Sequence, residues 1–299
     1  MDINSEEKPS LNFIMEEKDI NYSRNTIWFF WDEGLELAPE LVKISYDNWR
    51  VMNPEYDVVL LTTENVEEKI GLNITSLFQS ASARLGMAGK TDFLRLYLLY
   101  HWGGVWVDAT TFCLKPLGQW LNVQAEAPFF CFVQPDSCPD RQLISWFISA
   151  QPKNPLIYHL LIDAYLYIFK ERSQNIGISS ISTADKNKYP ELVSRTSTGK
   201  AYLQKEEERG VVPYFWLFYL FNEVVKTPGL EKHLSIDSYL SRRYSQPSAK
   251  FSDFIQSYVS KQTYRVSLSD FRERLNFLEE KNMISEVGMN LIECSRFSS

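Results

Sequence analysis

Apolar and polar residues fall into blocks that predict a strand, a helix and a second strand in the first part of the chain. Residues 25–31 (NTIWFFW) form a short aromatic-rich run, which predicts a buried strand. Apolar residues then recur at helical spacing over 39–53, between an opening proline and an Asn-Pro stop. Residues 56–61 (YDVVLL) predict a second buried strand. This order is typical of an α/β fold with a mostly parallel central sheet flanked by helices.

A long apolar helix is predicted at 87–102, after a short helix and loop over 64–82. Its apolar residues lie on more than one side, which predicts a central and buried helix. Gly103 and Gly104 supply the positive-φ stop. Residues 105–108 (VWVD) then predict a short strand that ends in a carboxylate.

The remaining elements are less regular. Residues 128–133 predict a strand, and 143–150 predict either a strand or a helix. An amphipathic helix is predicted at 156–170, and an aromatic helix at 215–225.

These blocks predict one main domain with additions. Residues 1–23 are polar and acidic and are expected to form an N-terminal arm outside the sheet. The main α/β domain runs over 24–229, and its polar, Ser/Thr-rich stretch 171–210 is interpreted as a mobile insertion or lid. Residues 230–299 are expected to form a helical C-terminal extension packed on the same domain.

Composition narrows the choice of function. The 299 residues carry a net charge of −7, which argues against nucleic acid as a partner. Aromatic residues make up 14%, which suits a deep core or a site that stacks sugars or bases. The acidic N-terminal segment has no secretory pattern, and the longest apolar run (211–221) is too short to span a bilayer. A cytoplasmic protein is therefore expected.

The candidate chemistry lies around the central helix and the strand after it. Asp92 and Arg95 are three residues apart and share one helix face. Asp108 stands at the carboxyl end of a predicted strand, where open α/β sheets bind their ligands. Two readings follow from residue types alone: a ligand site at one rim of the sheet, or an internal Asp92–Arg95 ion pair with Asp108 capping a loop.

The full pattern resembles the DXD-motif sugar transferases of glycosyltransferase family 32 and the related capsular polysaccharide synthesis proteins. The shared signature is Asp92, Arg95, Gly103-Gly104, Trp106 and Asp108. The version GGVWVDAT is similar to the capsular branch. Weaker similarity extends the resemblance over roughly residues 25–225.

The resemblance implies a GT-A fold, a Rossmann-like sheet that binds a nucleotide-sugar donor, with a UDP-sugar favoured. It also implies Mn²⁺ or Mg²⁺ against the donor diphosphate, with Asp108 holding the metal or the ribose. One position departs from the motif, because Thr110 replaces its second Asp. Positions 108 and 110 would share a side of a continuing strand, so Asp108 and Thr110 are the predicted metal ligands. A hydroxyl brings no charge, and metal binding is then weak, completed from elsewhere or dispensable.

Other roles also follow from the resemblance. Asp92 and Arg95 are expected to contact the donor sugar or its phosphates, and with Asp108 they form the predicted catalytic set. Trp31 is expected to stack on the base, with a core tryptophan as the alternative. Lys90, at the start of the helix, is expected to neutralise phosphate or else to lie exposed, and Gly104 completes the donor-binding set.

The predicted function is transfer of a hexose or N-acetylhexosamine to a capsular or cell-surface glycan, with a lipid-linked acceptor and peripheral contact at the inner face of the plasma membrane. The sugar transferases that this sequence resembles generally retain anomeric configuration. An inverting route would need a base, for which Glu223 and Asp237 are candidates, although both suit solvated or capping positions. His101 is expected to pack at the helix end. Residues 214–219 line an acceptor groove or belong to the core. The alternatives are a transferase acting on protein or a soluble glycan, and a non-catalytic nucleotide-sugar-binding protein.

Overall fold

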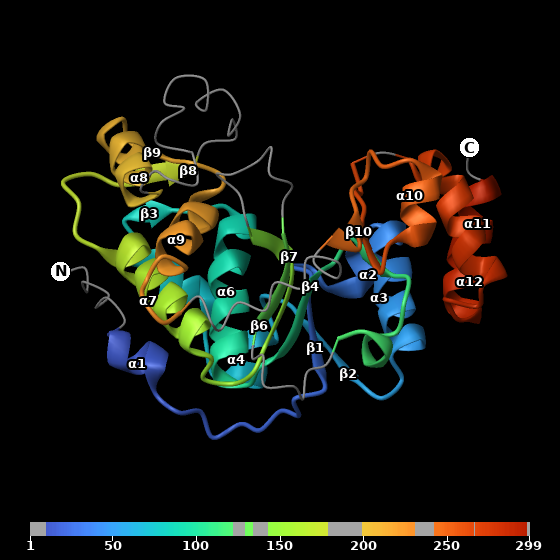
Figure 1. Ribbon diagram of the computed structural model, residues 1–299, viewed down its shortest axis with the longest axis horizontal. Helices are drawn as coiled ribbons and strands as arrows, with labels where there is room; N and C mark the ends of the chain where they lie inside the picture. Colours follow the sequence, from blue (N-terminus) through green and yellow to red (C-terminus); the bar gives the residue numbers. More distant parts are fainter. Residues whose placement is uncertain are drawn as a thin grey trace, which may run out of the picture.

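A five-stranded sheet lies at the centre of the protein, with helices on both of its faces (Figure 1). In this computed structural model the strand order is β2-β1-β4-β7-β6. The strands are β1 (Thr26–Phe30), β2 (Asp57–Leu61), β4 (Gly104–Asp108), β6 (Phe129–Val133) and β7 (Leu143–Ala150). The structure describes residues 10–121, 129–133, 143–178, 199–230, 242–265 and 267–297.

The strand directions confirm the α/β class with a mostly parallel sheet. β1 pairs in parallel with both β2 and β4, whereas β7 is antiparallel to its two neighbours, β4 and β6. β7 therefore runs against the other four strands. Its residues 143–150, for which a strand or a helix was predicted, form a strand that is buried along its whole length. This architecture is the one expected of a GT-A fold.

Helices cover each face of the sheet with apolar side chains. One face is covered by α6 (Met87–His101), α7 (Pro155–Phe169) and α9 (Trp216–Val224) (Figure 1). The other face packs against α3 (Glu40–Met52), whose Val42 and Trp49 are fully buried. The predicted helices therefore exist with bounds within two residues of those expected. Within the described part of the chain, no helix is both long enough and apolar enough to cross a membrane.

Two glycines lie between the end of α6 and the first residues of β4, where the backbone approaches its neighbours closely. Gly103 and Gly104 have φ values of +70° and +89°, a conformation that L side chains rarely adopt. A Cβ added at Gly104 would lie 2.4 Å from the carbonyl oxygen of Thr26 on β1. Gly104 thus allows β4 to start directly beside β1, so that Asp108 ends level with Phe30 in the register.

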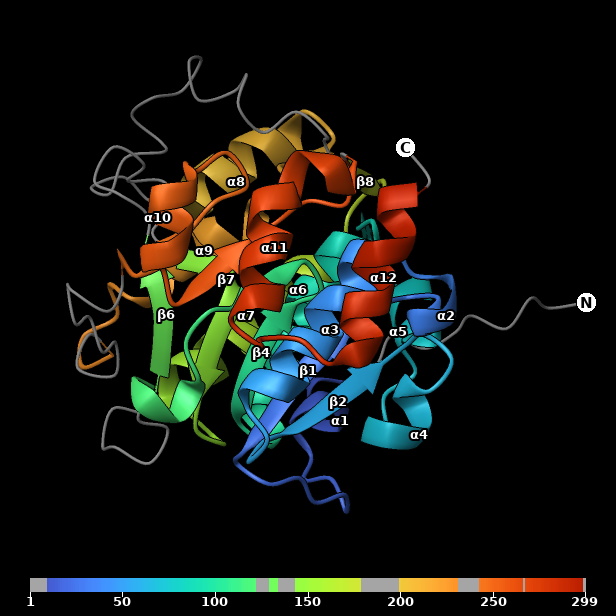
Figure 2. The ribbon, with the colours of Figure 1, turned by 90° about the vertical axis from the view of Figure 1, so that its right-hand side faces the viewer.

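The C-terminal part packs beyond α3 and contributes strands as well as helices (Figure 2). Helices α10 (Phe251–Gln256), α11 (Arg272–Glu280) and α12 (Glu286–Phe297) fit the predicted helical extension. The prediction was incomplete, because β10 (Tyr244–Ser245) and β11 (Val259–Lys261) join β5 (Thr111–Cys113) in a three-stranded sheet. This second sheet extends directly from the end of β4.

The predicted N-terminal arm and insertion are also partly described. Helix α1 (Leu11–Met15) lies outside the sheet, and its Ile14 is buried. Part of the stretch 171–210 is ordered structure, since it contains β8 (Ile176–Ile178) and α8 (Gly199–Glu208). Residues 179–198 of that stretch lie outside the described residues. The other short elements are α2 (Gly34–Leu37), α4 (Val66–Ile70), α5 (Ile74–Gln79), β3 (Ala83–Arg84), β9 (Val211–Val212) and the 3-10 turns η1 (Leu117–Gln119) and η5 (Leu268–Phe271).

Candidate active site

A cavity of about 680 Å³ opens at the carboxyl edge of the sheet. Its walls come from the ends of β1 and β4, the first turns of α6, the start of β7 and the segment after β11. This is the edge at which α/β sheets bind ligands, because neighbouring parallel strands end there together. The cavity brings together five of the predicted residues, Trp31, Asp92, Arg95, Asp108 and Thr110.

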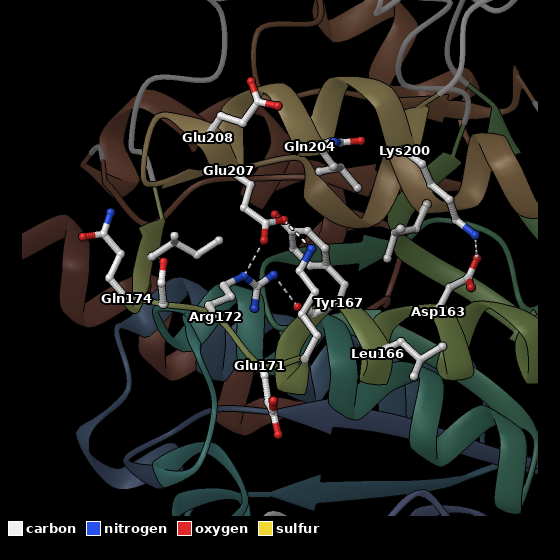
Figure 3. A pocket seen from close by; sticks show the side chains of 15 residues that line it. Asp163, Leu166, Tyr167, Glu171, Arg172, Gln174, Lys200, Gln204, Glu207 and Glu208 are labelled. Atoms are coloured by element: carbon white, nitrogen blue, oxygen red, sulfur yellow. Dashed lines mark hydrogen bonds and ion pairs between the residues drawn. The ribbon is translucent and has the colours of Figure 1, made fainter.

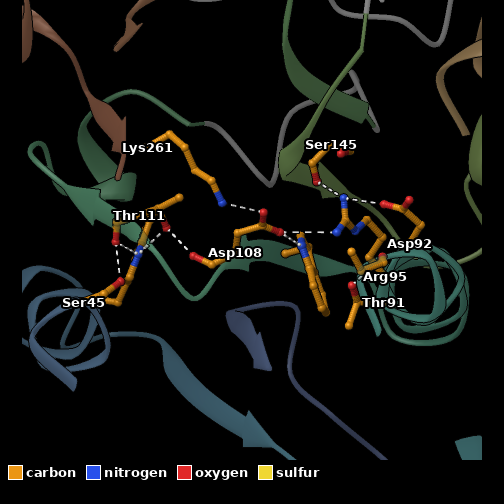
Figure 4. Close-up of polar contacts among 11 residues, drawn as sticks. Ser45, Thr91, Asp92, Arg95, Asp108, Thr111, Ser145 and Lys261 are labelled. Carbon is orange, nitrogen blue, oxygen red and sulfur yellow. Dashed lines mark hydrogen bonds and ion pairs between the residues drawn. The ribbon is translucent and has the colours of Figure 1, made fainter. Parts of the chain in front are cut away.

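Arg95 links the two carboxylates of the motif (Figure 4). Its Nη1 lies 3.0 Å from Asp92 Oδ1 and donates to the carbonyl oxygen of Ser145 at 2.7 Å, whereas its Nη2 lies 3.3 Å from Asp108 Oδ1. The guanidinium carbon is 5.0 Å from the centroid of the Trp106 ring. The side chain is only 5% exposed. The two expected arrangements therefore occur together. Asp92 and Arg95 form an ion pair, and this pair lies inside the cavity at the edge of the sheet.

Asp108 is held as a carboxylate between two cations. Its Oδ1 accepts from Trp106 Nε1 at 3.0 Å, and its Oδ2 is 2.7 Å from Lys261 Nζ. Burial alone would raise the pKa of Asp108, but the Lys261 ammonium and the Arg95 guanidinium outweigh it and lower this pKa to about 2. Asp108 is therefore ionised at neutral pH and is a weak base.

Asp92 has the opposite electrostatic environment. Burial raises its pKa to about 7, against the attraction of Arg95 and with a further increase from the Asp108 charge. Two carboxyl groups that share one arginine thus differ by several pKa units. Asp92 can gain or lose its proton near neutral pH, whereas Asp108 cannot.

The residues at the motif do not fit a divalent cation. β4 ends at Asp108, and residues 109–110 form a turn, so Thr110 is not placed by a continuing strand as expected. A metal bound to Asp108 Oδ2 would lie within about 5 Å of the Lys261 ammonium that already occupies that oxygen. Among the residues that the structure describes, no group of three or more His, Cys, Asp or Glu side chains is placed to hold a metal ion by itself. Both oxygens of Asp108 already face a protein cation, Oδ1 facing Arg95 and Oδ2 facing Lys261.

Trp31 follows β1 and faces the same cavity. Its Nε1 is buried and has no hydrogen-bond partner within the described residues. The ring meets Tyr264 edge to face, with centroids 5.4 Å apart. Tyr214, another cavity residue, is 43% exposed. These aromatic side chains give the cavity the surfaces that bases and sugar rings stack on.

Two predicted donor-binding residues lie elsewhere. Lys90 does not line the cavity, because its Nζ lies on another side of α6, 5.8 Å from the centroid of the Phe78 ring. Gly104 is buried at the start of β4, at the opposite end of the strand from Asp108, so its role is in packing. Neither residue is therefore among those that line the cavity.

Of the candidate bases, Glu223 does not line the cavity. Glu223 accepts from the backbone N–H of Gly199 at 2.6 Å and from Lys226 at 3.2 Å, so it caps α8. Asp237 lies outside the described residues. His101 packs as expected: its Nε2 is 2.9 Å from the carbonyl oxygen of Ile14, and burial lowers its pKa to about 4. Within segment 214–219, Tyr214 and Phe218 line the cavity while Trp216 and Tyr219 are buried, so both readings of the segment hold.

The sequence analysis missed the contribution of the C-terminal segment. Lys261, Gln262, Tyr264 and Arg265 all line the cavity, although they are more than 150 positions from Asp108. The only signal was the cluster of Lys, Tyr and Arg in KQTYR, and β11 is too short to show a strand pattern.

A second cavity of about 700 Å³ lies between α7, β8 and α8 (Figure 3). Lys170 and Arg172 both pair with Glu207, at 2.7 and 2.8 Å, and Lys200 pairs with Asp163 at 3.0 Å. Each of these cations is thus paired with a neighbouring carboxylate, and none of the residues of the sequence motif lines this cavity.

Comparison with known proteins gives a match over nearly the whole chain. The family model described as capsular polysaccharide synthesis protein matches residues 4–278. The O-glycosyltransferase braB of Annulohypoxylon truncatum is 28% identical over 166 residues, covering 50% of this chain and 38% of that protein. The inositol phosphoceramide mannosyltransferase 1 of Schizosaccharomyces pombe is 33% identical over 72 residues, covering 24% and 20%. The chain thus spans well under half the length of these curated relatives.

Among solved structures, the PaToxG glycosyltransferase matches with a TM-score of 0.39 and 14% identity, over 77% of this chain and 80% of that one.

Proposed function

The chain belongs to the capsular polysaccharide synthesis protein family, and from this premise we propose that it is a glycosyltransferase that uses a nucleotide-sugar donor. The observation that carries the proposal is the cavity in which Arg95 joins Asp92 to Asp108 beside the stacking face of Trp31. The two relatives are an O-glycosyltransferase and a mannosyltransferase, which are enzymes of the same class.

Each part of the cavity suits a part of the donor. The base stacks on Trp31, whose unpartnered Nε1 is available to a polar group of the ligand. The Asp92 carboxylate, held by Arg95, accepts hydrogen bonds from sugar hydroxyls, since charged acceptors bind hydroxyls strongly. Asp108 orients Arg95 and Lys261 towards the diphosphate. We favour a UDP-sugar that carries a hexose or N-acetylhexosamine.

We propose that the transfer retains anomeric configuration. The bond between C1 and the diphosphate oxygen breaks, and its electron pair moves to that oxygen. The acceptor oxygen bonds to C1 on the same face, and its proton leaves on the departing diphosphate. Asp108, with a pKa of about 2, is too weak a base to take this proton. Asp92 is held by Arg95 and is assigned to the hydroxyls of the donor sugar, so we assign the proton to the leaving group.

The acceptor is expected at the open side of the cavity. Tyr214 is exposed there and follows the buried Val212, and a flat ring of this kind stacks on sugar rings. We propose a capsular or cell-surface glycan, carried on a lipid and met by peripheral contact at the inner face of the plasma membrane. A protein or soluble glycan acceptor remains the alternative within the same chemistry.

The test is a screen of the purified protein against UDP-, GDP- and CMP-sugars. Thermal shift reports donor binding, and release of free nucleotide reports slow hydrolysis. We expect one donor to stabilise the protein and to be hydrolysed, and Asp108→Ala to abolish hydrolysis. Asp270→Asn, at an exposed position on η5, is the matched control. Stabilisation without turnover, even with glycan acceptors added, would support the non-catalytic alternative, and no stabilisation by any donor would contradict the proposal.

A further inference from the structure

Lys261 reaches the motif from the far end of the chain. β11 pairs antiparallel with β5, and in this register Lys261 stands opposite Thr111, three residues after Asp108. Its Nζ lies 2.7 Å from Asp108 Oδ2, and its side chain is 21% exposed. Strand pairing therefore fixes this lysine at the cavity, in contrast to a lysine on a free surface.

We propose that the Lys261 ammonium, with the Arg95 guanidinium, takes the place of a divalent cation and binds the donor diphosphate, so that this transferase works without a metal. The inference rests on the proposed function, because it concerns the same donor in the same cavity. It follows from the surroundings of Asp108, whose Oδ2 is already paired with the Lys261 ammonium and whose Oδ1 is already contacted by Arg95 and Trp106.

The two cations flank Asp108 on opposite sides (Figure 4). Arg95 approaches Oδ1 from α6, and Lys261 approaches Oδ2 from β11. Both side chains are largely shielded from solvent, so salt screens their charges less than it screens surface charges. Arg265 adds a third positive side chain to the lining of the cavity.

Both side chains also have hydrogen-bond donors left for a ligand. A lysine ammonium has three N–H donors, and the contact with Asp108 uses one of them. The Nε of Arg95 is buried and has no partner within the described ranges. Phosphate oxygens are suitable acceptors for both. Asp108 then has the role of holding the ammonium in place.

An ammonium group in place of a metal ion also suits the chemical step. When the C1–oxygen bond breaks, its electron pair adds negative charge to the terminal phosphate of the leaving diphosphate. A fixed ammonium beside that phosphate stabilises this charge, which is the task a metal has in metal-dependent transferases. The step needs no reactant beyond the donor and the acceptor.

The experiment measures binding of UDP and of inorganic pyrophosphate by titration calorimetry, once in EDTA and once in MnCl₂. For the wild type we expect the two dissociation constants to agree within about twofold. We expect Lys261→Ala to weaken binding of both probes in EDTA by about tenfold or more, because it removes a charge-assisted contact. Lys261→Arg should largely restore binding, and Lys250→Ala, at an exposed position outside the cavity, is the matched control. Circular dichroism verifies that each variant is folded.

Electron paramagnetic resonance of Mn²⁺ gives a second readout that needs no nucleotide. We expect the wild type to leave the signal of free Mn²⁺ unchanged. Two results would overturn the inference and leave the proposed function standing. One is that the probes bind only when Mn²⁺ is present. The other is that the wild type binds Mn²⁺ and the Asp108→Asn variant does not. Absence of binding of either probe and of every sugar nucleotide, with and without metal, would overturn the proposed function and the inference with it.

Discussion

Replacing Asp108 by Asn tests the electrostatics of the site without any ligand. The carboxylate lies between Arg95 and Lys261, which together lower its pKa from 3.8 to about 2. A group whose pKa is lower in the folded state stabilises the fold above its unfolded pKa, and this contribution is lost as the pH falls through the folded value. At about 1.4 kcal/mol per pKa unit, the shift corresponds to roughly 2.5 kcal/mol of unfolding free energy at pH 7.

We expect Asp108→Asn to lose up to this amount at pH 7 and about half of it at pH 3, where the wild-type carboxyl is mostly protonated in the unfolded state and still mostly ionised in the folded state. The value is an upper limit, because removing the Asp108 charge also relieves the buried carboxyl of Asp92. The amide keeps the shape of the side chain, so packing is unchanged.

The assay is urea unfolding followed by tryptophan fluorescence, at pH 7 and pH 3, with sucrose in both buffers to keep the protein folded in acid. Asp270→Asn, at an exposed position, should lower the free energy of unfolding little at either pH. An equal loss for Asp108→Asn at the two pH values would refute the reasoning, since the loss would then come from hydrogen bonding alone. No loss at pH 7 would show that the two cations do not stabilise the carboxylate.

Three further outcomes are expected. Gly104→Ala should lower the free energy of unfolding by on the order of 3 kcal/mol in urea melts, because a Cβ would strike the backbone of β1 at a positive φ, whereas Gly177→Ala, with open space around it, should not. Trp31→Ala should weaken UDP binding by about tenfold in calorimetry and leave pyrophosphate binding unchanged, because only the base loses its stacking surface. The affinity of the wild type for its nucleotide-sugar should rise between pH 6 and pH 8 as Asp92 ionises, with its pKa of about 7, and an Asp92→Asn variant that shows the same rise would contradict this assignment.

The sequence was sufficient to predict four of the five strands of the sheet, because these segments are strongly apolar, whereas residues 143–150 fitted a strand or a helix. The spacing of Asp92 and Arg95 on one helix face, and the place of Asp108 at a strand end, were also predictable from local geometry. The sequence did not show on which side of the helix Lys90 lies. Successive helix residues point about 100° apart, so the Lys90 side chain lies near Phe78 although Lys90 is two residues from Asp92. Lys261 could not be predicted, since the pairing of β11 with β5 depends on tertiary packing and both strands have three residues.

The pairing of β11 with β5 also has a consequence for biosynthesis. Lys261 and Asp108 are 153 positions apart in the chain. Because chains emerge from the ribosome N-terminus first, the sheet, α6 and the Arg95–Asp108 contact can form while β11 is still being made. A nascent chain that has exposed only its first domain has an incomplete cavity, open on the side that the C-terminal segment later forms. The cavity is therefore completed late, and a chain that terminates before β11 lacks the wall that carries Lys261.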